Sequence, residues 1–119
     1  MSKINKKFDL EERTACFGEN VIDLCRNIRK DIISDSIIRQ LIRSATSIGA
    51  NYMEANGVCS KKDFIHKCHL CKKEAKESMH WLRMLSKAIS DNDKYKDRIH
   101  TLWQEAKELS LIFGKICIN

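Results

Sequence analysis

The sequence lacks the residues that interrupt helices. It contains no proline and only four glycines in 119 residues. Without proline nothing forces a helix to break, and few glycines leave few positions for sharp turns. A fold built from strands and hairpins is therefore disfavoured, and long helices are expected.

Two further absences bear on the compartment of the protein. No stretch is apolar for long enough to cross a bilayer. The first seven residues, MSKINKK, have no apolar run behind their lysines, so they predict no secretory signal. Six cysteines would suit a disulfide framework in a secreted protein, but without such a signal reduced thiols are the favoured interpretation. We expect a cytoplasmic protein with no membrane contact.

The charges of the chain are unbalanced. There are 22 Lys and Arg residues against 16 Asp and Glu residues, which gives a formal net charge of +6. An excess of this size favours an anionic partner without establishing one, because net charge bears on partners and solubility rather than on fold.

Apolar residues recur at alternating steps of three and four in four segments, the spacing that keeps one face of a helix against its neighbours. We predict helices over residues 9–30, 35–56, 61–90 and 94–117. Short connections between long helices force neighbouring helices to run antiparallel. The sequence therefore predicts one all-α domain, residues 1–119, folded as an antiparallel up-down-up-down four-helix bundle. The predicted core positions are Leu10, Thr14, Phe17, Val21, Leu24 and Ile28; Ile38, Leu41, Ala45, Ile48, Tyr52 and Ala55; Phe64, Cys68, Cys71, Ala75, Ser78, Leu82, Leu85 and Ile89; and Tyr95, Ile99, Leu102, Ala106, Leu109, Phe113 and Ile116.

Polar residues between the segments predict where the helices begin and end. Ser34 or Asp35 is expected to cap the second helix, and Ser60 the third. The Asn-Gly pair at 56–57 is expected to end the second helix in the left-handed conformation. The polar residues 91–93 are expected to close the third helix and open the fourth.

The outer face of the third helix carries an uninterrupted basic row. Stepping back two residues from each core position, about 200° around the helix, reaches only lysine, arginine or histidine. We call these eight residues the basic row: Lys62, His66, His69, Lys73, Lys76, His80, Arg83 and Lys87.

A row of cations can replace the counterions of a phosphate backbone, so the basic row predicts RNA or DNA binding. Arg39 and Arg43 of the second helix are candidates for a parallel row. Binding of this kind should be salt-sensitive, led by backbone contacts, and stronger below about pH 6.5, where histidines gain charge. The alternative is an ordinary solvated helix face that keeps the bundle soluble.

Large apolar residues also lie outside the core stripes, and a simple four-helix bundle does not account for them. Trp and Met are enriched in subunit interfaces, so the surplus suggests a homo-oligomer. The alternative is a wider core stripe. The candidate interface residues are Ile42, Met53, Leu70, Trp81, Met84 and Trp103.

Motifs for catalysis or metal binding are weak. Cys68 and Cys71 form a Cys-x-x-Cys motif, but a zinc site needs a second ligand pair, and both positions fall on the core stripe. No phosphate-binding loop occurs. We predict no enzymatic activity, no metal and no cofactor.

Two stretches resemble a bacterial family of four-helix bundles, the 23S rRNA intervening-sequence proteins. They are QLIRSATSIGANYMEA at residues 40–55, and SKKDFIHK at 60–67 continued by KEAKES at 73–78 and Trp81-Leu82. The resemblance extends in layout over residues 8–113. The family-matched polar residues are Arg43, Ser44, Asn51 and Glu54 in the second helix and Lys73, Glu74 and Glu77 in the third.

The resemblance implies a ring-like homopentamer without agreed catalytic residues. A related group looks like accessory proteins of diversity-generating retroelements, which bind a reverse transcriptase and nucleic acid through a basic surface. A protein-interaction scaffold or accessory subunit is therefore the alternative to a nucleic-acid-binding protein. Asn51 and Glu54 are expected to hydrogen-bond the third helix or a neighbouring subunit. Cys68 and Cys71 stand where the family usually has aliphatic residues, and Met53 where a charged residue is common.

Overall fold

The computed structural model describes residues 6–118, which are mostly helical and have no strand among them. The helices are α1 (Lys6–Asn27), α2 (Ile32–Ala55), α3 (Lys61–Ala88) and α4 (Lys96–Ile118), with a short 3-10 turn, η1 (Asp93–Tyr95), leading into α4. The all-α prediction is confirmed, and each predicted helix boundary lies within three residues of the observed one. Five of the seven residues that predict no secretory signal lie outside the described residues. Of the helices described, none is both long and apolar enough to span a membrane.

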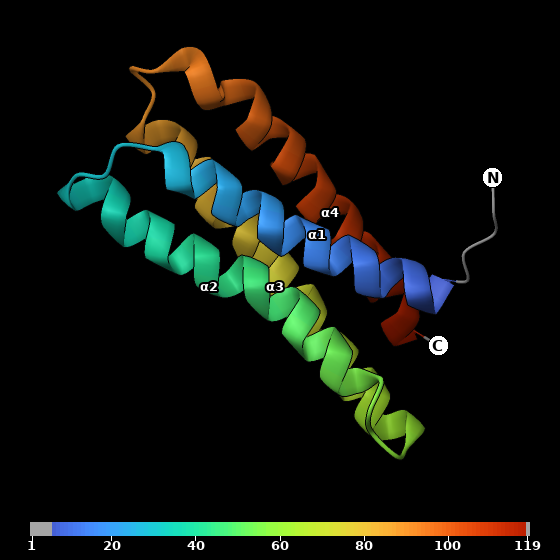
Figure 1. Ribbon diagram of the computed structural model, residues 1–119. Coiled ribbons are helices and arrows are strands. Elements are labelled where there is room, and N and C mark those ends of the chain that lie inside the picture. The colour runs from blue at the N-terminus through green and yellow to red at the C-terminus, as the bar shows by residue number, and fades with distance from the viewer. Residues whose placement is uncertain (1–5, 119) are drawn as a thin grey trace.

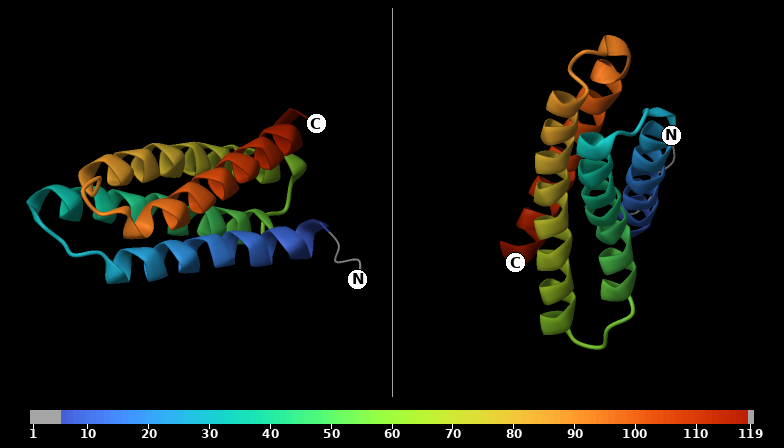
Figure 2. Two further views of the ribbon diagram at one scale, coloured as in Figure 1. Left: turned by 90° about the horizontal axis from the view of Figure 1, so that it is seen from above. Right: turned by 90° about the vertical axis from the view of Figure 1, so that its left-hand side faces the viewer.

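Successive helices run in opposite directions, so that α1 starts and α4 ends at the same end of the molecule (Figure 1). The most extensive contacts join α2 to α3 and α3 to α4, followed by α1 to α2, and α1 touches α4 over a smaller area. Figure 2 shows the arrangement of the four helices from two further sides. α3 is therefore flanked by α2 and α4.

The buried residues form one cluster to which all four helices contribute. Every predicted core position of α1 and α2 is buried, including the polar Thr14. The exceptions elsewhere are Phe64, Ile89 and Ile116, which are partly buried and pack against the cluster near helix ends. The core prediction is confirmed because a period of three and four is what burial of one helix face requires.

The cap of α2 is Asp31, and the prediction of Ser34 or Asp35 as the cap is wrong. Asp31 Oδ1 accepts hydrogen bonds from the backbone N–H of Ile33 (3.0 Å) and of Ser34 (2.8 Å). Ser34 Oγ accepts in return from the Asp31 N–H at 3.0 Å, which completes a capping box. The bond from the Ser34 N–H, above all, lowers the pKa of the Asp31 carboxyl.

The other helix ends are closed by local bonds. Ser60 caps α3 as predicted, since its side chain accepts from the Asp63 N–H at 3.1 Å. Asn92 does the same for η1 through the Lys94 N–H at 3.0 Å. The left-handed ending predicted at 56–57 is wrong: none of the described residues has positive φ, and Gly57 donates back to the Glu54 carbonyl in a right-handed turn.

Small residues let α1 and α2 approach closely. A Cβ added to Gly49 would lie 3.4 Å from Thr14 Oγ1, and one added to Gly18 would lie 3.6 Å from the Ala45 carbonyl oxygen. Both are ordinary van der Waals distances, so a methyl group at either position would touch the neighbouring helix without displacing it. Small side chains at these positions therefore set the separation of α1 and α2.

This spacing predicts opposite effects for two substitutions of Gly49. Gly49→Leu should destabilise the fold by about 1–3 kcal/mol, because the added side chain collides with Thr14 of α1. Gly49→Ala, the matched control, should leave stability unchanged or raise it by up to about 1 kcal/mol through helix propensity. Thermal unfolding followed by circular dichroism measures both. Equal melting temperatures for Gly49→Leu and the wild type would contradict the close approach of the two helices.

Candidate nucleic-acid interface

The basic row lies on the surface of α3. All eight of its side chains are exposed, whereas the core stripe of the same helix, from Cys68 to Leu85, is buried. The period that buries one face of α3 thus presents the opposite face to solvent. From Lys62 to Lys87 the row spans 25 residues, about 38 Å of helix at 1.5 Å per residue. The structure therefore shows the predicted row as one continuous exposed stripe.

The row keeps its positive charge because its cations are not paired with acids. Across residues 6–118 the ion pairs engage Arg13, Arg39, Arg43 and Lys67, none of which belongs to the row. These four cations are paired with carboxylates, whereas those of the row meet no carboxylate within bonding distance. An approaching anion therefore has no internal competitor for them.

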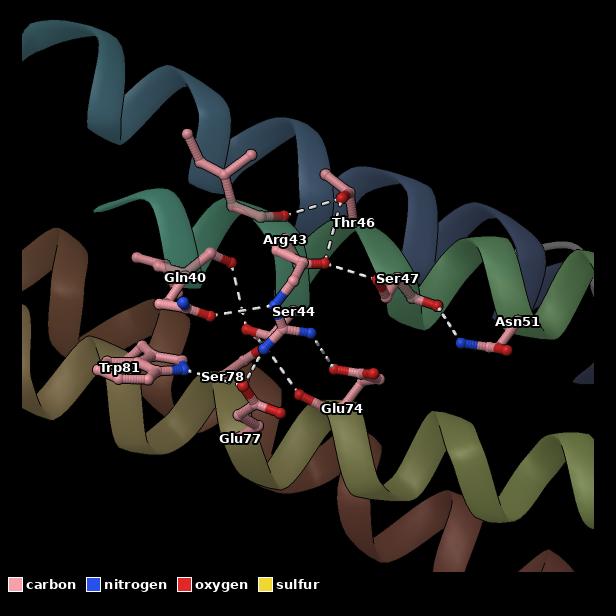
Figure 3. Close-up of polar contacts among 12 residues, drawn as sticks. Gln40, Arg43, Ser44, Thr46, Ser47, Asn51, Glu74, Glu77, Ser78 and Trp81 are labelled. Carbon is pink, nitrogen blue, oxygen red and sulfur yellow. Dashed lines mark hydrogen bonds and ion pairs between the residues drawn. The ribbon is translucent and has the colours of Figure 1, made fainter. Parts of the chain in front are cut away.

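Arg39 and Arg43, the candidates for a parallel row, are both engaged in ion pairs. Arg39 Nε pairs with Asp35 Oδ2 at 3.0 Å on its own helix. Arg43 reaches across to α3, where its guanidinium contacts Glu74 Oε1 at 3.3 Å and also pairs with Glu77 (Figure 3). Both arginines have their charge compensated.

Arg43 nevertheless serves the basic row indirectly. Three acids of α3 adjoin the row: the exposed Asp63, and Glu74 and Glu77, whose side chains are only partly exposed. Arg43 holds the two glutamates on the α2 side of the helix, and Trp81 Nε1 donates to Glu77 Oε2 at 3.0 Å. These two carboxylates are thereby neutralised and directed away from the exposed lysines.

Most of the family-matched polar residues lie along the contact between α2 and α3. Ser44 Oγ and Ser78 Oγ are buried and lie 2.9 Å apart, and Ser78 also donates to the Glu74 carbonyl at 2.9 Å (Figure 3). Glu54 accepts from Lys67 Nζ at 2.6 Å, as expected for a bond to the third helix. Asn51 instead donates to the Ser47 carbonyl of its own helix at 2.9 Å. Arg43, Ser44 and Glu54 therefore join α2 to α3, whereas Asn51 bonds within α2 and Lys73 belongs to the exposed row.

The candidate interface residues do not gather on one patch. Ile42, Trp81 and Trp103 are partly buried and pack against the core cluster, which matches the wider core stripe. Met53 is 72% exposed and lines a groove between α1 and α2. Leu70 and Met84 are partly exposed on α3.

The Cys-x-x-Cys motif is part of the core. Cys68 and Cys71 are fully buried, and Cys71 Sγ lies 3.5 Å from the Ile48 carbonyl oxygen. Burial raises the pKa of the Cys68 thiol to about 11 and that of Cys71 to about 12. Such thiols stay protonated at neutral pH and are poor nucleophiles and ligands. In the part of the chain that the structure describes, no three His, Cys, Asp or Glu side chains are placed to hold a metal ion.

An open groove beside the end of the basic row was not predicted. It lies where α3 ends and α4 begins, and it is lined by Arg83 and Lys87 of the row and by Lys96, His100 and Trp103. The three-residue spacing of His100 and Trp103 places them on one face of α4, which is the only signal for this groove in the sequence.

Comparisons with known proteins agree with this architecture. The family model described as 23S rRNA-intervening sequence protein matches residues 6–113. A crystal structure of a protein of unknown function from the S23 ribosomal protein family of Bacteroides thetaiotaomicron superimposes with a TM-score of 0.81 at 26% identity, covering 97% of this chain and 100% of that one. Curated proteins give no match. The chain belongs to the family of 23S rRNA-intervening sequence proteins.

Proposed function

We propose that the protein binds the phosphate backbone of RNA or DNA through the basic row, as a non-enzymatic, cytoplasmic homo-oligomer. The observation that supports this most directly is the row itself: eight exposed basic or histidine side chains on one helix face, none of them paired with a carboxylate in the described structure. A nucleic acid presents a regular line of negatively charged phosphates. Cations such as those of the row bind these phosphates and release their counterions.

The length of the row is matched to a nucleic-acid segment. About 38 Å corresponds to roughly 11 base pairs of duplex, at about 3.4 Å per base pair. Five of the eight residues, Lys62, Lys73, Lys76, Arg83 and Lys87, carry a permanent charge. At most five phosphates per protomer are then neutralised near neutral pH. Because contacts to phosphates carry no sequence information, binding led by the row should depend little on sequence.

Binding should weaken steeply with salt. If all five permanent cations contact phosphates, the logarithm of the binding constant should fall with log salt at a slope of about −4.5 for duplex DNA and about −3.5 for single strands. Fluorescence anisotropy with labelled oligonucleotides of roughly 20 nucleotides measures the slope. Binding that ignores salt would exclude a phosphate-led mechanism, and no binding at all would favour an accessory protein that meets an acidic partner.

The proposed oligomer is a pentamer, as the resemblance implies. A ring of identical subunits needs two different contact patches on each subunit. Apolar surface lies on separate faces here: Met53 on α2 is 72% exposed and Leu111 on α4 is 63% exposed. Sedimentation equilibrium should give a mass five times that of the 13.8 kDa chain. A monomer mass at micromolar concentration would exclude the ring.

A further inference from the structure

The groove beside the end of the basic row combines an apolar base with a cationic rim. It has a volume of about 790 Å³ and is open to solvent. Leu82 and Ile99 lie at its base and are themselves buried. The volume falls within the range of small-molecule sites, roughly 300–1,000 Å³. The groove therefore has room for a planar ring and its substituents beside the row.

One side of the groove is aromatic. The rings of His100 and Trp103 lie nearly parallel, with an angle of 6° between their planes and 6.4 Å between their centroids. Lys107 Nζ lies 5.7 Å from the centroid of the Trp103 ring, on the same helix. Flat aromatic side chains of this kind stack with nucleobases, and every base offers a face for such stacking.

The rim of the groove is positive. Arg83 and Lys87 are the last two members of the basic row, and Lys96 stands at the start of α4. Asp97 is the one acid among the lining residues, so the permanent charge of the rim is positive. The rim is continuous with the row because Arg83 and Lys87 belong to both. A polyanion bound along the row therefore reaches the aromatic side of the groove directly.

We propose that this groove binds an unpaired nucleobase of a single-stranded nucleic acid, stacked on His100 and Trp103, while the adjoining phosphates lie on Arg83 and Lys87. The proposal rests on the nucleic-acid binding proposed above and makes it more specific: the preferred ligand is a single strand. A base in a duplex is paired and stacked, so it enters the groove only if it is first flipped out, which costs a few kcal/mol.

The test is the effect of two aromatic substitutions on three ligands of equal length, roughly 20 nucleotides: single-stranded oligo-dA, its abasic counterpart, and a duplex. Trp103→Leu removes the stacking ring and keeps an apolar side chain against the core. His100→Ala changes an exposed residue and should fold normally. Thr101→Ala, an exposed neighbour that does not line the groove, is the control.

We expect both aromatic substitutions to weaken binding of the oligo-dA strand, by about 5- to 150-fold for Trp103→Leu. Binding of the abasic strand and of the duplex should change by less than about twofold, as should all binding by Thr101→Ala. Equal losses on all three ligands, or wild-type affinities that are equal for oligo-dA and the abasic strand, would overturn the groove proposal. If the wild type binds neither strand nor duplex, the proposed nucleic-acid-binding function is wrong. If it binds in a salt-dependent way that His100→Ala does not change, only the groove proposal is wrong.

Discussion

Reversing three charges of the basic row should abolish nucleic-acid binding while leaving the fold intact. Lys73→Glu, Lys76→Glu and Arg83→Glu together replace three exposed cations in the middle and at the end of the row. Each change removes a phosphate contact and adds a repulsive carboxylate, so affinity should fall by at least about 1,000-fold near 0.1 M salt. The salt slope on duplex DNA should flatten by about three units. Anisotropy titrations against the wild type measure both quantities.

A second triple variant separates the row from the overall charge of the protein. Arg26→Glu, Arg29→Glu and Arg98→Glu change three exposed arginines that lie on α1, the loop after it, and α4. Both variants lower the formal net charge from +6 to zero, since each substitution changes the charge by two. If the row is the binding surface, the control variant should lose less than about tenfold in affinity, because only the long-range attraction of the net charge is weakened. Similar losses in both variants would mean that net charge, and no particular surface, attracts the ligand.

The row variant should not unfold, because its three side chains take part in no ion pair within the described structure. Substitutions of exposed residues away from specific contacts usually change stability by less than about 0.5 kcal/mol each. An unchanged melting temperature and oligomer mass would therefore assign the loss of binding to the surface. A variant with lower mass would instead place the row at a subunit contact.

The sequence predicted the helices and the core well because both follow from one periodic rule. Every stripe position in α1 and α2 is buried, since only that face can meet the neighbouring helices. The start of α2 was misplaced because Ile32 and Ile33 follow its cap yet are 90% and 63% exposed, so they break the expected pattern. Asp31 and Ser34 have capping-box spacing, which the periodicity of the helix does not reveal.

Contacts between helices could not be predicted in the same way. The basic row followed from the period of α3 alone, and its exposure is as expected. The role of Arg43 depends on how α2 and α3 are aligned, and the sequence does not fix that alignment. Its guanidinium is bound to Glu74 and Glu77, so a residue predicted to lie on a binding surface also neutralises two acids beside the row. The groove with His100 and Trp103 likewise exists only where the end of α3 meets the start of α4.

Truncating Phe113 should cost more stability than any surface change. Phe113 is fully buried, and its ring meets that of Tyr52 edge-on, with 5.6 Å between centroids and 60° between planes. The contact joins α4 to α2, two helices that are not sequence neighbours. Phe113→Ala should lower the free energy of unfolding by about 3–5 kcal/mol, from the lost burial and the cavity left behind. That is a large share of the roughly 5–15 kcal/mol available to a domain.

Gln104→Ala is the control for Phe113→Ala. Gln104 also lies on α4 but is exposed, so its truncation should change stability by less than about 0.5 kcal/mol. Urea unfolding at one fixed protein concentration compares the two, because an oligomer unfolds at a concentration-dependent midpoint. Equal midpoints would contradict the placement of Phe113 in the core. At urea concentrations below its unfolding midpoint, the Phe113→Ala variant should still bind nucleic acid like the wild type, because the basic row is unchanged. Binding should disappear only as the bundle that holds α3 unfolds.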